Sequence, residues 1–175
     1  REGEAIRDFM YPDRVVIGTD NVKANNILKN LYDPLIKRGR KYLKTSRRAA
    51  ELIKYASNAF LATKITFINE MANLCEKIGV DIEDISIGMG LDKRIGSRFL
   101  RAGPAYGGSC FPKDAQALVR MAQEHKASSR IVEAVIEVNE KQKARMIKKI
   151  RNALGGNESG KTVSRCRLTN MVLKK

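Results

Sequence analysis

The residues whose types and spacing are best suited to chemistry lie in one short segment, Gly107-Gly-Ser-Cys-Phe-Pro-Lys-Asp114. Pro112 is typical of the first turn of a helix. We therefore expect Cys110 just outside a helix start, where unpaired N–H groups and the positive end of the helix dipole favour a thiolate. Lys113 adds a cation, and Asp114 follows one turn along with a carboxylate that can handle a proton or a water. The segment fits a nucleophilic cysteine, and an inert loop cysteine is the alternative that spacing leaves open.

A second pair of polar residues, Lys54 and Asn58, is separated by four positions in a segment with helical periodicity. Side chains at this spacing share one face of a helix. An ammonium and a carboxamide aimed at the same point can stabilise a developing oxyanion. The same face is otherwise polar, so a solvated surface is the ordinary alternative.

Other kinds of site are excluded by the residue counts. His125 is the only histidine, which excludes a histidine-based triad or a multi-histidine metal site, and we expect it to cap the end of a helix. The three cysteines include no Cys-x-x-Cys pair, so no zinc site, no other metal site and no disulfide framework is predicted. A reducing, cytoplasmic setting is the default expectation. Cys75 lies among apolar residues and is expected in the core.

One segment matches a nucleotide-binding pattern by letters alone. Residues 155–162 read Gly-Gly-Asn-Glu-Ser-Gly-Lys-Thr, which satisfies G-x-x-x-x-G-K-[ST]. A working phosphate-binding loop needs a buried strand before it and a helix after it. Here a helical pattern precedes the segment and none follows, so we interpret it as a flexible linker.

The elements that must position these residues are mostly helical. Residues 14–18 predict a short buried strand closed by a glycine. The helices expected from apolar spacing, caps and breakers cover about 21–31, 46–78, 81–87, 112–125 and 129–154, and either Asp20 or Asn21 is expected to cap the first of them. Pro34 and Gly39 mark the connection after the first of them. Six glycines and a proline between Gly88 and Gly108 predict a loop region that can approach a ligand closely.

The segment from Ser46 to Ile78 predicts one long helix. It contains neither Gly nor Pro, and its apolar residues recur with a period of 3.6 residues until Gly79. At 1.5 Å per residue such a helix is roughly 50 Å long. A single domain rarely covers so long a helix, so we expect a second lobe or a second subunit to pack along it.

Charge is concentrated in two clusters. The 175 residues carry a formal net charge of +15, of which residues 37–48 hold +7 and residues 141–175 hold +10. Such clusters can bind nucleic acid or anionic lipid, but a solvated linker and a basic helix end are favoured. Aromatic residues make up only 6% of the chain, which supplies few stacking platforms for single strands. No apolar run approaches the roughly 20 residues that span a bilayer, so no membrane partner is expected.

With these motifs in view, the sequence resembles the UDP-glucose 6-dehydrogenases of the UDP-glucose/GDP-mannose dehydrogenase family from Arg1 to about Val163. The resemblance is carried by five segments: Arg1-Glu-Gly3, Tyr11-Pro-Asp-Arg-Val-Val-Ile-Gly18, Ala50-Glu-Leu-Ile-Lys-Tyr-Ala-Ser-Asn58, Arg94-Ile-Gly-Ser-Arg-Phe-Leu100 and Gly107-Gly-Ser-Cys-Phe-Pro-Lys-Asp114. Related GDP-mannose enzymes share Gly-Gly-Ser-Cys but differ at the next residue, so Phe111 and the Arg94 segment favour UDP-glucose.

The resemblance implies oxidation of the sugar C6 alcohol to the carboxylate of UDP-glucuronate with two NAD. Cys110 would capture the aldehyde as a thiohemiacetal, and a later thioester would be hydrolysed by water. Lys54 and Asn58 would hold the C6 oxygen, Asp114 would assist Lys54 and the water, and Glu2 would lie near the water and the nicotinamide. The implied NAD-side residues are Glu2 and Lys113. The implied substrate-binding residues are Arg1, Glu2, Lys54, Asn58, Arg94, Phe99, Leu100, Arg101, Ala102, Gly103 and Gly107.

The resemblance also implies an architecture. We expect a mainly α fold, in which a central helical dimerisation domain over residues 46–154 contains the cysteine loop and the very long helix. Residues 1–45 would be a small α/β remnant of a Rossmann-like NAD-binding lobe, and residues 155–175 a linker and an atypical basic tail. Arg94 would reach the substrate of a neighbouring subunit in a homodimer. Ala105 stands where the family usually has glycine, so an altered backbone is expected there.

Departures from the family pattern lead to the hypothesis of a fragment. No Gly-x-Gly-x-x-Gly occurs anywhere, and after Val163 the chain reads Ser-Arg-Cys-Arg-Leu instead of a hydrophobic strand. We therefore expect the isolated chain to be inactive. The alternative function is a non-enzymatic basic helical module that dimerises or binds nucleic acid.

Overall fold

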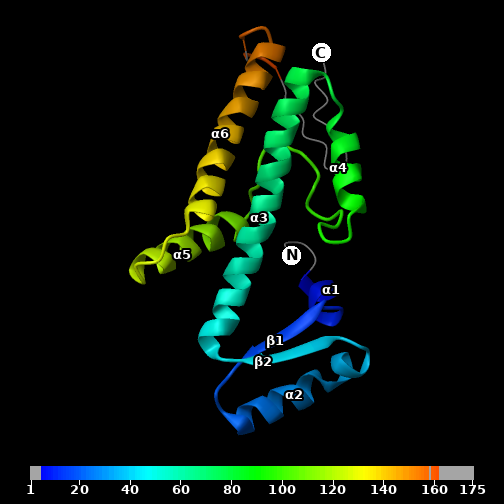
Figure 1. Cartoon of the computed structure of the whole chain (residues 1–175), viewed down its shortest axis with the longest axis vertical. Coiled ribbons are helices and arrows are strands. Elements are labelled where there is room, and N and C mark those ends of the chain that lie inside the picture. The colour runs from blue at the N-terminus through cyan, green and yellow to red at the C-terminus, as the bar shows by residue number, and fades with distance from the viewer. Residues whose placement is uncertain (1–4, 158, 162–175) are drawn as a thin grey trace. The chain divides into compact units, whose positions relative to one another are not determined.

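The structure is a computed structural model that describes residues 5–157 and 159–161 (Figure 1). The chain separates into two compact units, Arg1–Asn58 and Ala59–Lys175, with the boundary inside the longest helix. The elements in chain order are α1 (Ala5–Met10), β1 (Arg14–Gly18), α2 (Val22–Lys37), β2 (Lys41–Thr45), α3 (Arg47–Ile78), α4 (Ile82–Leu91), α5 (Cys110–Glu124) and α6 (Arg130–Ala153). The expected mainly α fold with a small α/β part is confirmed.

The first unit contains a parallel pair of strands. β1 and β2 pair in register from Arg14 opposite Lys41 to Gly18 opposite Thr45. Val15 on β1 is buried, and on β2 the Tyr42 hydroxyl donates to Asn25 Oδ1 of α2 at 3.0 Å. β2 is not predicted by the sequence, because its exposed lysines make this stretch resemble a charged linker.

Helix α2 begins as predicted and ends later than predicted. Asn21 caps it, since its Oδ1 accepts the Ala24 N–H at 2.9 Å. The expected end near Leu31 is wrong, because the helix continues through Pro34 to Lys37. Pro34 and the residue four positions before it are both exposed, so water can satisfy the single carbonyl that loses its helical partner. Gly39, with φ +83°, ends the helix.

The long helix α3 is confirmed at both ends. The Ser46 hydroxyl accepts the Ala49 N–H at 3.2 Å at its start, and Gly79 takes φ +73° at its end. In the next helix, α4, the Asp81 cap is confirmed by its 2.8 Å bond from Glu83 N–H, but the helix runs to Leu91. The expected loop therefore starts only after α4.

One of the glycines within helix α4, Gly90, is needed for a close contact with the backbone of Ser97. A Cβ on Gly90 would lie 3.0 Å from Ser97 Cα, so only glycine lets the helix approach this backbone without displacing it. Gly90 is thus a packing residue within a helix and not, as expected from the sequence, a loop residue.

The second unit packs α5 and α6 around the segment that precedes α5. Ala62 of α3, Tyr106 and Val135 of α6 form a buried cluster, with Ile65 and Phe111 against it. Cys75 is buried, as predicted. His125 caps α5 as predicted, with its Nδ1 2.9 Å from the Met121 carbonyl oxygen. None of the described helices is both long and apolar enough to cross a membrane.

An ion-pair cluster fastens α3 to α6. Arg145 lies 2.8 Å from Glu76, and Lys149 pairs with the other oxygen of the same carboxylate. The hydrogen bond from Lys149 is the largest cause that holds the pKa of Glu76 below its ordinary value of 4.5, and Arg145 lowers it further against the opposing effect of burial. A depressed pKa in the folded state stabilises the fold above pH 4.5, and this contribution is lost as the pH falls through the lower folded-state pKa.

We expect Glu76→Gln to lower the free energy of unfolding at pH 7 by up to about 1 kcal/mol, because the Glu76 side chain is 45% exposed and solvent screens the pairs. At about pH 3 the difference between the two proteins should shrink. Urea denaturation at both pH values measures it. An equal difference at both pH values would show that the charge of Glu76 contributes nothing.

Candidate functional site

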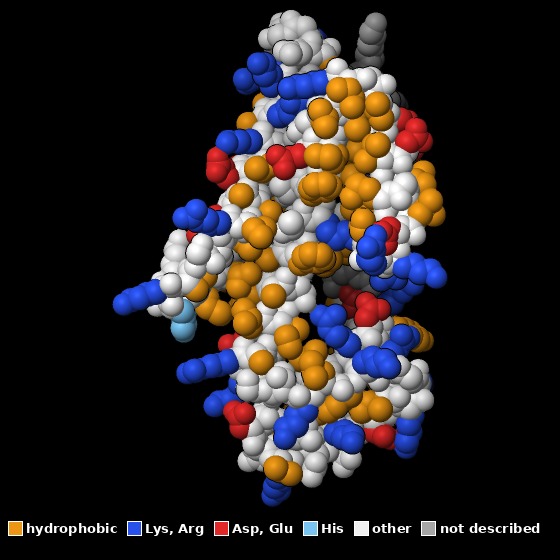
Figure 2. Space-filling view, in the orientation of Figure 1, with side chains coloured by type: hydrophobic (Ala, Val, Ile, Leu, Met, Phe, Trp, Pro, Cys, Tyr) orange, Lys and Arg blue, Asp and Glu red, His pale blue; other side chains and the backbone are white. Residues whose placement is uncertain are grey.

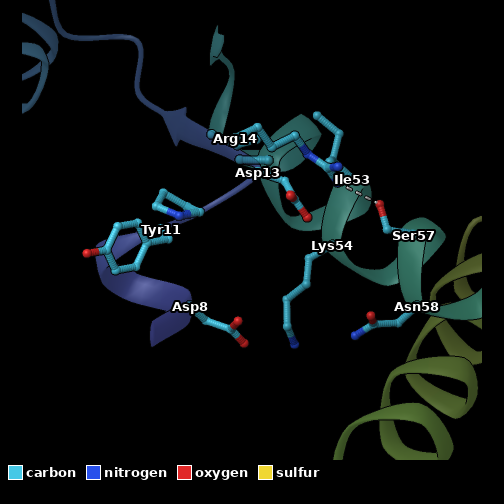
Figure 3. A pocket seen from close by; sticks show the side chains of 11 residues that line it. Asp8, Tyr11, Asp13, Arg14, Ile53, Lys54, Ser57 and Asn58 are labelled. Carbon is cyan, nitrogen blue, oxygen red and sulfur yellow. Dashed lines mark hydrogen bonds between the residues drawn. The ribbon is translucent and has the colours of Figure 1, made fainter. Parts of the chain in front are cut away.

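The first unit contains a pocket of about 560 Å³ between the stretch from Asp8 to Val16 and the beginning of α3. Lys54 and Asn58, four residues apart on α3, both line it. Figure 3 shows their side chains extending toward the same space, which Asp8 of α1 also approaches. Arg14 donates to Ser57 Oγ at 3.1 Å and ties the start of β1 to α3. The shared face predicted for Lys54 and Asn58 therefore lines a pocket.

An ammonium and a carboxamide in one pocket suit an oxygen that gains negative charge. The Lys54 Nζ lies 5.1 Å from the centre of the Tyr55 ring, close enough for a cation–π contact. Both Lys54 and Asn58 also have further interactions within the protein. The pair offers one full positive charge and a neutral donor, which is the composition of an oxyanion site.

The cysteine segment belongs to the second unit. Cys110 is exposed and is the first residue of α5, so it lies inside the helix start and not just outside it as predicted. Ser109 occupies the N-cap position without a capping side-chain bond, and its Oγ lies 3.7 Å from Cys110 Sγ. The first-turn N–H groups of a helix have no helical partner, and Cys110 lies among them.

Asp114 and Lys113 point into different environments. Asp114 is 1% exposed and has an interaction partner within the protein, whereas Lys113 is exposed. A buried carboxylate one turn after Cys110 is held in place by its surroundings, as an acid–base group must be.

The segment between α4 and α5 is anchored at both ends by packing. Leu100 is 2% exposed, and its carbonyl accepts the Ser86 hydroxyl of α4 at 2.7 Å. The ring of Phe111 meets Phe99 and Tyr106 edge to face, with centroids 6.2 and 6.1 Å apart. The remaining residues expected over the substrate are Arg101, Ala102, Gly103 and Gly107, and they lie in this same anchored segment.

Two residues of this segment, Arg94 and Ala105, were expected to have special roles. Arg94 is exposed and donates twice to the Asp92 carboxylate. Its Nη2 lies 2.6 Å from Asp92 Oδ2, and its backbone N lies 2.9 Å from Asp92 Oδ1. Lys64 of α3 donates to the carbonyls of Ile95 and Gly96 and fixes the turn that follows. Ala105 has φ +150°, a conformation that side chains rarely adopt, so the alanine is accommodated under strain.

Sequence reasoning missed the side-chain amides that hold this segment. Asn69 of α3 and Asn139 and Gln142 of α6 are buried and bond to its backbone. A signal was available, because Val135, Asn139 and Gln142 follow the spacing of a core-facing stripe. Polar residues at core positions indicate buried hydrogen-bond partners.

Several expected site residues are not brought together by the described structure. Arg1 and Glu2, and the tail after Lys161, lie outside the described residues. Lys54 and Asn58 belong to the first unit and Cys110 and Asp114 to the second, so each pair is placed only within its own unit. Among the described residues, no group of three or more possible His, Cys, Asp or Glu ligands could hold a metal ion.

Two segments are candidates for nucleotide binding: the glycine-rich segment that begins at Gly155, and the turn between β1 and α2. Helix α6, not a strand, precedes Gly155, and Lys161 donates back to the Leu154 carbonyl at the end of α6. The strand–turn–helix that the structure does describe is β1–α2, where the Asn21 side chain accepts one N–H of the first turn, that of Ala24. The chain also lacks Gly-x-Gly-x-x-Gly. These residues therefore do not form an NAD site by themselves.

Comparison with known proteins identifies the family. The model of the UDP-glucose/GDP-mannose dehydrogenase family, central domain, matches residues 48–141, which are more than half of the chain. The chain belongs to this family. The family resemblance inferred from the five sequence segments is thereby confirmed.

Relatives match this member of the family over almost all of its residues. A UDP-glucose 6-dehydrogenase of Rickettsia felis is 53% identical over 169 residues, 97% of this chain and 38% of that protein. One from Bacillus subtilis is 52% identical over 94% of this chain and 36% of that protein. The structure of a UDP-glucose dehydrogenase from Pyrobaculum islandicum aligns with a TM-score of 0.82 and 41% identity over 89% of this chain and 35% of that chain. The chain thus spans about 38% of the Rickettsia felis relative.

Proposed function

We propose that this family member provides the cysteine nucleophile of a UDP-glucose 6-dehydrogenase, an oxidoreductase that forms UDP-glucuronate. The observation that carries the proposal is the exposed Cys110 in the first turn of α5, with the carboxylate of Asp114 buried one turn behind it. A thiol that meets substrate must be accessible, and its acid–base partner must be held still. The names of the relatives supply the substrate class.

The chemistry proposed for the chain's own residues is an addition to the C6 aldehyde of the sugar. Cys110 Sγ forms a bond to C6 as the carbonyl electrons move to oxygen, and protonation of that oxygen gives a thiohemiacetal. Lys54 and Asn58 are proposed to hold the C6 oxygen, and Asp114 to move protons. Substrate contacts are proposed for Arg94, for Phe99 to Gly103 and for Gly107.

NAD is proposed as the cofactor only because the chain belongs to this family. Where it binds, it accepts hydride from the sugar. The residues described here do not form a complete site for it, and the isolated chain is proposed to be inactive. Residues 1–45 are proposed as part of an NAD-binding lobe, residues 46–154 as the central domain, and residues 155–175 as a linker with its tail.

We expect UDP-glucose to slow alkylation of Cys110 by iodoacetamide at least about fivefold, because a bound sugar would cover a reactive thiol. ADP-glucose is the matched control and should leave the rate unchanged. Peptide mass spectrometry measures the rate at Cys110 and at the buried Cys75. Equal rates with and without UDP-glucose would count against the proposed substrate.

We also propose that the second unit pairs with a second copy of the chain. Phe60, Phe67, Leu74 and Ile78 of α3 are exposed at spacings of seven, seven and four, and we name them the α3 stripe. Figure 2 shows hydrophobic side chains gathered over α3 and α4. Ile87 and Leu91 of α4 are also exposed. An exposed apolar surface of this kind is typical of an interface, and a homodimer is the partner that the family relation favours.

A further inference from the structure

The backbone between α4 and α5 is held by side-chain amides at two points, Gly103 and Tyr106. At both residues, carboxamides from the neighbouring helices α3 and α6 satisfy the N–H and the C=O. Backbone groups in buried loops must find partners, and a carboxamide offers a donor and an acceptor in one rigid plane. The loop is therefore fixed in the manner of a strand, although it belongs to no sheet.

Asn139 makes the tighter of the two attachments. Its Oδ1 accepts the Tyr106 N–H at 2.8 Å, and its Nδ2 donates to the Tyr106 carbonyl at 3.1 Å. Asn139 is 1% exposed and Tyr106 is 4% exposed, so water does not compete for these bonds. Aspartate lacks the donor and leucine lacks both groups, so only asparagine satisfies both sides of this residue at this length.

The attachment at Gly103 uses three amides. The Gly103 N–H donates to Asn69 Oδ1 at 2.7 Å, and Gln142 Nε2 donates to the Gly103 carbonyl at 3.4 Å. Asn73 Nδ2 donates to Gln142 Oε1 at 2.9 Å and so fixes the orientation of the Gln142 amide. Because Asn139 and Gln142 are neighbours on one face of α6, both attachments depend on the same helix.

We infer that Asn139 is a positioning residue for Cys110. Only Gly107, Gly108 and Ser109 separate Tyr106 from Cys110, and the Tyr106 ring also meets Phe111, the residue after the cysteine. If Tyr106 is free to move, the residues that lead from it into α5 are no longer held in place. The Phe111 ring in the first turn of α5 then also loses its contact with the Tyr106 ring. The thiol then leaves its place beside the first-turn N–H groups of α5. This inference rests on the proposed role of Cys110 as nucleophile.

The test compares the rate of Cys110 alkylation in the full chain and in variants. We expect Asn139→Leu, which has the same number of side-chain heavy atoms and the same branching but no amide, to slow alkylation at pH 7 by about fivefold. Glu76→Gln is the matched control, because it weakens the contact of α3 with α6 without touching the loop. It should leave the Cys110 rate within about twofold.

The outcomes separate the inference from the proposed function. A folded Asn139→Leu protein whose Cys110 rate equals that of the unaltered chain would overturn the inference. If that variant does not fold, Asn139→Ala removes the same amide without adding volume or charge, and it should slow Cys110 alkylation in the same direction. UDP-glucose protection of the unaltered chain is scored separately, so its absence would contradict the substrate and leave the alkylation comparison valid.

Discussion

A chain carrying Phe67→Glu should be a monomer at concentrations at which the proposed pairing would make the unaltered chain a dimer. Phe67 lies in the middle of the α3 stripe, and in a symmetric pair both copies would contribute it to the interface. Burying a phenylalanine side chain is worth roughly 1.5–3 kcal/mol, and a glutamate in its place must also be desolvated. With two copies affected, we expect the dissociation constant to rise by at least about a hundredfold.

Sedimentation equilibrium over a range of chain concentrations measures this change. Ile131→Glu is the matched control, because Ile131 on α6 is 73% exposed and lies outside the α3 stripe. It should leave the association unchanged. A monomeric unaltered chain at high concentration would contradict the proposed pairing, and equal effects of both substitutions would show that the α3 stripe is not the interface.

Gly18→Val should destabilise the first unit by about 3 kcal/mol or more. A Cβ on Gly18 would lie 2.7 Å from Ala50 Cβ and 2.9 Å from Arg47 Cα, closer than real Cβ contacts allow. One of these neighbours is backbone at the start of α3, so a side-chain rotation cannot relieve the clash. The strand β1 or the first turn of α3 must move, and the pocket around Lys54 lies against both.

Urea denaturation, followed by circular dichroism, tests this prediction. Gly88→Ala is the control, since a Cβ there meets nothing within 4 Å and Gly88 is inside α4. That substitution should stabilise the chain by roughly 0.5–1 kcal/mol, because alanine favours a helix more than glycine does. If Gly18→Val is as stable as the unaltered chain, the close approach of β1 to α3 is incorrect.

The helices could be predicted where local signals were strong. α3 has an unbroken apolar period between Ser46 and Gly79, and α4 starts at a capping aspartate. β2 could not be predicted, because its residues follow no apolar alternation and become a strand only by pairing with β1. Proline and glycine usually interrupt helices, so Pro34 and Gly90 were expected outside them. Pro34 is tolerated inside α2 because it is exposed, and Gly90 lies inside α4 because it contacts Ser97 closely.

The residues of the candidate site could be predicted from the sequence, but the side-chain hydrogen bonds that hold its backbone in place could not. Cys110, Lys54 and Asn58 stand in recognisable segments, and helical spacing alone put Lys54 and Asn58 on one face. The partners of Asn139 could not be derived, because they are backbone groups of Tyr106, 33 residues away along the chain. Periodicity shows that an amide faces the core, but long-range packing decides what it bonds to.

The spacing of the α3 stripe also constrains how two copies could lie against each other. Seven residues of an α-helix fall about 20° short of two full turns, so Phe60, Phe67 and Leu74 trace a shallow left-handed path around α3. Two helices that keep such paths in contact must cross at about +20°, whereas a steep crossing near −50° would join them at one point only. The seven-residue spacing of Phe60, Phe67 and Leu74 therefore predicts the angle at which the α3 helices of two paired chains would cross.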